Sequence, residues 1–114
     1  MKEMRFIPVG DFEKEWKGIG GSANDLHRLY VEIERLGIHG KPLYGNLRVV
    51  RGRIGKTGKS GGVRVAYFYF IENRTVFLFA VYDRRKQDGF TKEELVELDA
   101  LCEEIKGAYK NTER

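Results

Sequence analysis

The sequence predicts an α+β fold in which helices pack on one face of a mainly antiparallel sheet. Residues 63–71 and 75–82 are rich in aromatic and β-branched residues and are separated by a three-residue connection, which is typical of a β-hairpin. Two other segments place apolar residues at helical spacing after a capping-box pattern. The predicted order of elements is β-α-α-β-β-β-α, because packing helices on the sheet buries the apolar sides of both. At 114 residues the chain is expected to form a single domain over residues 1–114.

The first forty residues predict one strand and two helices. Residues 4–8 are an expected strand, which its final proline restricts to an edge or an end of the sheet. Asp11 is the expected N-cap of a short helix over residues 12–17. Ser22 and Asp25 have capping-box spacing, with Asp in the place of Glu or Gln, so a second helix is expected to begin there. Its apolar residues follow at helical spacing, and Gly37 is expected to end it: Leu26, Leu29, Tyr30, Ile33 and Leu36.

The remaining residues predict three strands and a final helix. A loop that contains Pro42 leads to a strand over residues 47–54, and a basic, glycine-rich turn follows at residues 55–62. The two hairpin strands come next.

The final helix is expected to begin at a second capping box, formed by Thr91 and Glu94. The chain is expected to fray over residues 108–114. One apolar stripe of this helix is expected to pack on the sheet: Leu95, Leu98, Leu101, Cys102 and Ile105.

Positive charge is concentrated in the middle of the chain. Residues 41–92 carry twelve Lys or Arg and three acidic residues, a net charge of +9, whereas residues 1–40 carry −1 and residues 93–114 carry −4. The same middle segment contains the aromatic strands. A folded sheet with charge of one sign indicates a polyanionic partner, and nucleic acid is the commonest such partner.

Several classes of function are not expected from this composition. No apolar run approaches the ~20 residues that a membrane span needs, and the start of the chain does not read as a secretory signal peptide. The single cysteine, Cys102, cannot form an internal disulfide and is expected to pack in the core. The expected compartment is the reducing cytoplasm, with no membrane partner. No group of side chains has metal-ligand spacing, so neither a metal nor a cofactor is expected.

The glycine-lysine loop allows three interpretations. Gly58, Lys59 and Ser60 match the end of a Walker A phosphate-binding loop, but the leading glycine of that motif is missing and the loop precedes a strand instead of a helix. The range 55–58 matches the Gly-x-x-Gly clamp of KH domains, which needs helices on both sides. The third interpretation is a basic hairpin loop beside an RNA cleft, with lysines long enough to wrap phosphates.

One string of basic, glycine and aromatic residues is distinctive. Leu47-Arg48 and Arg51 are followed by Gly58-Lys59-Ser60-Gly61-Gly62-Val63-Arg64-Val65 and then by Tyr67-Phe68-Tyr69. An apolar strand that ends at Tyr82 and a helix start at Thr91 come after it. This pattern resembles the RelE/HigB superfamily of bacterial type II toxins, and its HigB branch most. The resemblance covers residues 47–105 well and residues 1–46 only through the order of elements.

The resemblance implies a RelE-like fold and an established kind of activity. Members of the superfamily are toxins of toxin-antitoxin systems and act as endoribonucleases (mRNA interferases), which cleave mRNA in the ribosomal A site and inhibit translation. The implied partners are therefore the ribosome with its mRNA and a cognate antitoxin. That antitoxin is expected to be an acidic helix-turn-helix protein from the adjacent gene, and operator DNA would be contacted only through it.

The residues themselves are compatible with metal-free RNA cleavage. In this chemistry the 2′-OH attacks the neighbouring phosphate, which needs a base, an acid and positive charge at the phosphate; fixed cations supply the largest contribution. Both histidines, His27 and His39, lie outside the basic segment. Arg cannot act as a base at neutral pH, whereas Lys can when burial and neighbouring cations lower its pKa. Lys59 and Lys56 are the candidates.

Eleven residues are candidates for the site. The resemblance aligns Arg64 with an arginine that clamps the scissile phosphate, and Arg84 with a basic residue after the last strand. The expected catalytic set is Arg64, Arg84, Lys59, Arg51 and Arg53. The expected RNA-binding set is Lys56, Arg48, Tyr82, Arg85, Lys86 and Phe90. For each charged residue the competing interpretation is a solvated surface charge.

Two departures from the family pattern affect this site. Asp83 directly precedes Arg84 and is placed to neutralise it in part. Phe90 can stack on a base but cannot transfer a proton. Two alternative functions therefore stay open: a catalytically silent relative that binds RNA, the ribosome or an antitoxin, and a protein-interaction module whose basic cleft receives an acidic peptide.

Overall fold

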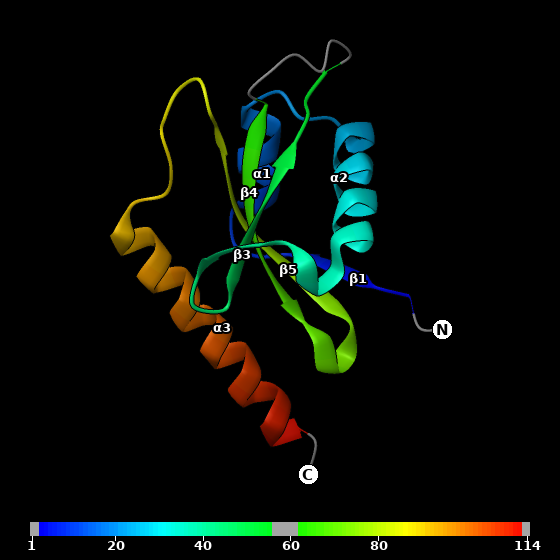
Figure 1. The fold of residues 1–114 in the computed structure, drawn as a ribbon, viewed down its shortest axis with the longest axis vertical. Coiled ribbons are helices and arrows are strands. Elements are labelled where there is room, and N and C mark those ends of the chain that lie inside the picture. The colour runs from blue at the N-terminus through cyan, green and yellow to red at the C-terminus, as the bar shows by residue number, and fades with distance from the viewer. Residues whose placement is uncertain (1–2, 56–61, 113–114) are drawn as a thin grey trace.

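The computed structural model describes residues 3–55 and 62–112 (Figure 1). Within these residues, three helices flank a five-stranded sheet. The sheet has the strand order β1-β5-β4-β3-β2, in which β1 is parallel to β5 and every other neighbouring pair is antiparallel. This confirms the predicted α+β fold with a mainly antiparallel sheet. The elements along the chain are β1 (Arg5–Pro8), α1 (Phe12–Gly18), α2 (Ala23–Leu36), β2 (Lys41–Tyr44), β3 (Leu47–Gly52), β4 (Val63–Phe70), β5 (Thr75–Asp83) and α3 (Lys92–Thr112).

Helices cover both faces of the sheet, so the expectation that they share one face is wrong. α1 and α2 pack on one face, and α3 runs diagonally along the other, at the lower end of the sheet in Figure 1. Successive residues of a strand point to opposite faces, so β4 contributes to both cores. The α1/α2 core includes Phe12, Trp16, Leu29, Ile33, Val50, Val63, Val65, Tyr67, Val76 and Leu78. The α3 core includes Leu47, Phe68, Phe70, Phe79 and Cys102.

Both predicted capping boxes are present. The Asp25 backbone N–H donates to the Ser22 hydroxyl at 3.1 Å, and the Ser22 N–H donates to the Asp25 carboxylate at 3.0 Å. Thr91 and Glu94 make the same reciprocal pair at the start of α3, at 3.1 and 2.8 Å. Asp11 occupies the N-cap position of α1, as predicted, but its side chain makes no capping hydrogen bond.

The strand β2 was not expected from the sequence, which predicts a loop there. It is a four-residue edge strand, and its second residue is Pro42, which has no backbone N–H to offer a ladder. Its pairing with β3 reaches no further than Lys41 opposite Val49. Among the described residues, the last three residues of β3 therefore have no strand on their outer side.

A polar cluster fastens α3 to the turn between β2 and β3. Asn46 donates from its backbone N–H and its side-chain amide to Asp99, at 2.7 and 2.9 Å, and from the same amide to Glu103 at 2.6 Å. Lys106 donates to the Asn46 side-chain oxygen at 3.3 Å. Because α3 continues to Thr112, the expected fraying is not found over residues 108–112.

The outer side of α3 faces solvent. Leu101, which the sequence assigns to the packed stripe, is 37% exposed, whereas Cys102 is fully buried. Burial raises the pKa of the Cys102 thiol to about 12. Neither α3 nor any other helix in the described part of the chain is both long enough and apolar enough to cross a membrane.

Candidate nucleic-acid interface

Three side chains form a row across the upper part of the sheet. Arg51 of β3 lies opposite Arg64 of β4, and Arg64 lies opposite Tyr82 of β5. Residues directly opposite each other in antiparallel strands project from the same face. The register therefore places two arginines and a tyrosine side by side, on the face that α3 covers further down.

The charges in this row act on one another. Arg64 is half-buried, and this burial lowers the pKa of its guanidinium; the positive charges of Arg51 and Arg84 lower the pKa further. An arginine remains protonated despite such a shift. Three cations are therefore held close together, and a bound anion relieves their repulsion. A phosphate is an anion that matches the planar, forked guanidinium geometry.

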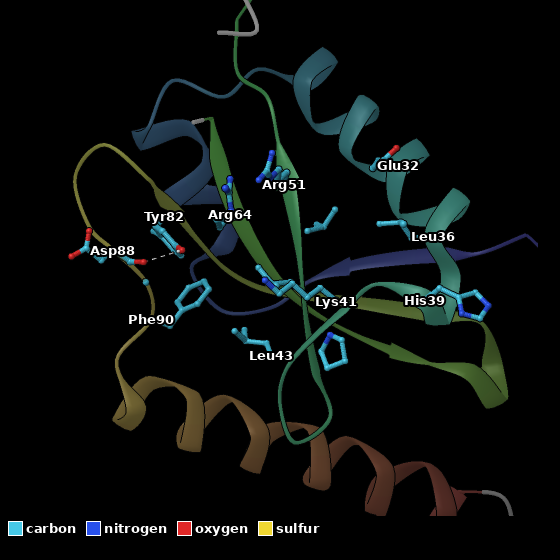
Figure 2. Close-up of a pocket in the computed structure, with 14 residues that line it drawn as sticks. Glu32, Leu36, His39, Lys41, Leu43, Arg51, Arg64, Tyr82, Asp88 and Phe90 are labelled. Atoms are coloured by element: carbon cyan, nitrogen blue, oxygen red, sulfur yellow. Dashed lines mark hydrogen bonds between the residues drawn. The ribbon is translucent and has the colours of Figure 1, made fainter. Parts of the chain in front are cut away.

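The row faces a cavity of about 720 Å³. Figure 2 shows Arg51, Arg64, Tyr82 and Phe90 on one side, Glu32, Leu36 and His39 on the other, and Lys41 and Leu43 between them. The full lining combines cations with apolar and aromatic groups: Glu32, Leu36, His39, Lys41, Pro42, Leu43, Val49, Val50, Arg51, Arg64, Tyr82, Asp88, Gly89 and Phe90.

Two aromatic rings close one end of the cavity. The Tyr82 and Phe90 rings meet edge to face, with centroids 4.8 Å apart and an interplanar angle of 87°. The Tyr82 hydroxyl donates to the Asp88 carbonyl at 3.5 Å. Nucleic-acid bases stack on aromatic side chains, so this pair can hold a base while the arginines hold its phosphate.

The turn after β5 is held by Asp83. Its carboxylate accepts hydrogen bonds from the Arg85 backbone N–H at 2.9 Å and from the Arg85 guanidinium at 3.2 and 3.0 Å. These hydrogen bonds from Arg85 lower the pKa of Asp83, so the carboxylate stays charged. The expectation that Asp83 neutralises Arg84 is corrected: Asp83 pairs with Arg85, while the charge of Arg84 acts on Arg64.

Solved structures of one bacterial toxin, alone and in complexes, are similar to this arrangement of elements. A chain of the intact E. coli RelBE toxin-antitoxin complex matches with a TM-score of 0.52 and 24% identity, over 69% of this chain and 94% of that chain. The isolated E. coli RelE toxin matches with a TM-score of 0.51 and 16% identity, over 87% of this chain and 99% of that chain. A double arginine-to-alanine mutant of E. coli RelE in complex with a peptide of its antitoxin matches with a TM-score of 0.52 and 19% identity, over 83% and 93% of the two chains.

This chain has the RelE toxin fold. At these identities the likeness establishes the fold and not the activity. No model of a known protein family matches the sequence, and no curated protein matches it. The RelE-like fold that the sequence pattern implies is therefore confirmed only by the comparison with solved structures.

The RelE-like fold brings some of the candidate residues together and separates others. Arg51, Arg64, Tyr82 and Phe90 line the cavity, and Arg84 lies near enough to Arg64 to affect it. Arg53 lines a neighbouring hollow that shares Arg51 with the cavity. Lys56 and Lys59 lie outside the described residues. The candidates that project elsewhere are Arg48, Arg85 and Lys86.

Arg48 has a different environment from the other candidates. Its guanidinium donates to the Gly40 carbonyl at 2.6 Å, which holds the chain just before β2, and its side chain lines a separate hollow with Phe68 and Lys106. Arg85 is bound to Asp83, and Lys86 is exposed. A role of these three residues in RNA binding stays a prediction.

The far wall of the cavity is not predicted from the sequence. Lys41 and Leu43 come from β2, and Glu32 and His39 come from the end of α2 and the turn that follows. A short run of strand-compatible residues around a proline is the signal of an edge strand, and it would have placed Lys41 beside β3. Within residues 3–55 and 62–112, no three His, Cys, Asp or Glu side chains are grouped so as to hold a metal ion.

Proposed function

We propose that this chain is the toxin of a toxin-antitoxin pair and cleaves mRNA on the ribosome. The observation that carries the proposal is the row of Arg51, Arg64 and Tyr82 across three strands, inside a cavity of about 720 Å³, on a RelE-like fold. The row offers fixed cations for a phosphate and an aromatic end for a base. This pair of features fits single-stranded RNA better than a free phosphate or an acidic peptide.

The chemistry assigned to the row is stabilisation of the transition state. When the 2′-oxygen attacks the phosphorus, negative charge grows on the non-bridging oxygens, and cations already in place stabilise that charge without reorganisation. Arg64 is central in the row, so it is the expected clamp, with Arg51 and Arg84 beside it. Lys59 and Lys56 are the proposed general bases, which would take the proton from the 2′-OH. Phe90 has no proton to give to the leaving 5′-oxygen. The RNA is expected to be presented by the ribosomal A site, which supplies orientation.

The proposed site also sets a requirement for the partner that silences it. Covering a row of cations with protein costs several kcal/mol per unpaired charge unless carboxylates meet those cations. We therefore expect an acidic antitoxin encoded next to this chain, which occupies or blocks the cavity. Co-expression of the two proteins should yield a complex that no longer binds ribosomes. A neighbour that co-purifies and leaves ribosome binding intact would contradict occlusion.

A catalytically silent RNA-binding relative is the second candidate function. It is favoured by Phe90, which places a ring without a hydroxyl beside Tyr82 where a proton donor would be useful. Such a protein would bind ribosomes or RNA and leave the message intact.

Cleavage of mRNA on programmed ribosomes distinguishes the two functions. The purified chain is expected to cut ribosome-bound mRNA, and Arg64→Ala is expected to lower the rate at least about a hundredfold, the usual effect of removing one group that stabilises transition-state charge. Unchanged thermal unfolding of the variant is the control for folding. Binding without cleavage by the parent would favour the silent relative, and full activity of Arg64→Ala would refute the assignment of the row.

A further inference from the structure

A second hollow lies beside the cavity, between α2 and the outer edge of β3. It measures about 400 Å³, and its lining comes from one face of α2 and from the end of β3: Arg28, Leu29, Glu32, Arg51, Gly52 and Arg53. Arg51 and Glu32 line both the hollow and the main cavity, so the two spaces adjoin. A further hollow of about 500 Å³ shares Arg28 and continues to Asn24 and His27 at the start of α2. The three spaces adjoin one another through these shared residues, and together they are called the track along α2.

The hollow exists because β2 stops short of the end of β3. The pairing of β2 reaches only Val49, and the residues beyond it are flanked by α2 instead of a strand. At this point a Cβ on Gly52 would lie 3.0 Å from Val63 of β4, which is a tight contact, and 3.6 Å from Leu29 of α2, which is an ordinary van der Waals contact. The outer edge of β3 is therefore accessible to a ligand at this end, inside a hollow that α2 bounds on the other side.

Arg28 is positioned in this hollow by a buried carboxylate. It pairs with Asp25, which is 5% exposed, and donates to the Gly55 carbonyl at 3.4 Å, both through its Nη2 atom. Burial alone would raise the pKa of Asp25, but hydrogen bonds from Ser22, Arg28 and Gly55 outweigh it and lower the pKa. Asp25 therefore stays charged and holds the Arg28 side chain, which is 55% exposed. A guanidinium has five N–H donors, so Arg28 can hold Asp25 and a second anion together.

The charge of the hollow favours an anion. Its lining has three arginines and one carboxylate, Glu32, and that carboxylate is bound by Arg35 through hydrogen bonds of 3.0 and 2.6 Å. The hydrogen bonds from Arg35 lower the pKa of Glu32, so its negative charge persists but is matched within α2. Arg28 is matched by Asp25 in the same way, so Arg51 and Arg53 supply the net positive charge of the hollow, and Arg28 adds further N–H donors.

We propose that the hollow is a second phosphate subsite, built from Arg28 and Arg53, for the nucleotide adjacent to the one in the main cavity. Single-stranded RNA then runs from the Tyr82–Phe90 end of the cavity, past Arg51, and over the outer edge of β3 onto α2. The inference rests on the proposed function and adds a path for the RNA. An extended acidic peptide is the competing occupant, and the track favours RNA because its far end has two aromatic rings, which bases need for stacking and carboxylates do not.

The test compares short and long RNA that cannot be cleaved. Fully 2′-O-methylated oligonucleotides of three and eight nucleotides are titrated against the parent, Arg28→Gln, Arg28→Lys and Lys110→Gln at several salt concentrations. Arg28→Gln is expected to weaken binding of the eight-nucleotide RNA about tenfold, the usual effect of losing a hydrogen bond to a charged group, and to leave the three-nucleotide RNA unchanged. It should also reduce the slope of log affinity against log salt by about 0.7, the value for one phosphate of a single strand.

The other variants separate charge from folding. Arg28→Lys keeps the charge and is expected to retain the salt slope of the parent. Lys110→Gln removes one charge from an exposed position on α3 and is expected to change neither the dependence of affinity on RNA length nor its dependence on salt.

If Arg28→Gln retained the parent's dependence on RNA length and its salt slope, the proposal of a second subsite would be wrong while the proposed function stood. If the parent's affinity for RNA were itself insensitive to salt, the proposed function would fail first. A glutamate-rich decapeptide tests the peptide alternative. The proposal would be overturned in favour of a peptide site if this peptide displaced the long RNA from the parent but not from Arg28→Gln, and if Arg28→Gln bound RNA as the parent does.

Discussion

Arg51 and Arg64 lie directly opposite each other on neighbouring antiparallel strands, which puts two positive side chains on the same face of the sheet. Like charges in this position destabilise a sheet by a fraction of a kcal/mol to about 1 kcal/mol. The pair therefore lowers stability in the free protein, and an anion bound between the two reverses the effect.

Arg51→Gln is expected to separate stability from function. Removing one of the two facing charges should raise the free energy of unfolding by roughly 0.2–1 kcal/mol, because the repulsion disappears. The same change should weaken RNA binding and lower the salt dependence of the affinity. Chemical denaturation and RNA titration measure the two effects, and Lys110→Gln is the matched loss of charge. A variant that lost both stability and binding would indicate that Arg51 has a structural role instead.

Asp83→Asn is expected to move stability and RNA affinity in opposite directions. The amide loses the ion pair with Arg85, so the turn after β5 is held less firmly and the melting temperature should fall. Arg85 is released and the net charge becomes more positive, so affinity for RNA at low salt should rise and its salt slope should become steeper. If affinity fell together with the melting temperature, the pairing would be needed to position Arg84 or Phe90.

Phe90→Ala is expected to weaken RNA binding by about 1–3 kcal/mol, the usual contribution of stacking one base on an aromatic ring. The ring also contacts Tyr82 edge to face, so the variant leaves Tyr82 less constrained. Phe90→Tyr keeps the ring and should keep the affinity. Binding of a single-stranded RNA, measured by fluorescence anisotropy, gives the comparison. Equal affinities for Phe90→Ala and the parent would remove the aromatic pair from the interface.

Asp25→Asn is expected to weaken the dependence of stability on acid pH. The pKa of Asp25 is lower in the folded protein than its ordinary value of 3.8, so the carboxylate contributes stability that is complete above that value. The contribution is lost as the pH falls through the folded-state pKa. Asp83 contributes to the pH dependence of stability in the same direction, because its pKa is also lowered in the folded protein. Unfolding free energies between neutral pH and about pH 2 should fall less steeply for Asp25→Asn than for the parent; an identical slope would contradict the assignment.

Local signals were sufficient to predict most of the fold. The hairpin strands β4 and β5 and both capping boxes depend on neighbouring residues, and the structure confirms them. β2 was missed because its signal is weak: the strand is short and contains Pro42, and its pairing is supplied by β3. The face on which α3 packs is likewise set by the whole sheet, since its apolar stripe would fit either side.

The arginines of the site could be selected from the sequence, but their partners could not. Spacing along β3 shows that Arg48 and Arg51, three residues apart, point to opposite faces, and the structure separates them accordingly. The residue that lies opposite Arg51 depends on the register between β3 and β4, and no local sequence pattern predicts this register. Asp83 forms its ion pair with Arg85 and not with Arg84, and this pairing depends on the shape of the turn after β5.

The hydrogen bonds between Asn46 and α3 have a consequence for the order in which the site is expected to form. Its partners Asp99 and Lys106 lie 53 and 60 residues further along the chain. Contacts of such long sequence separation form late, because a large loop must close before they are made. The turn that carries Asn46 also ends β2, which supplies Lys41 to the cavity. We therefore expect the far wall of the cavity to reach its final position only after α3 has docked, so a nascent chain that already contains all the arginines of the row would not yet have a complete site.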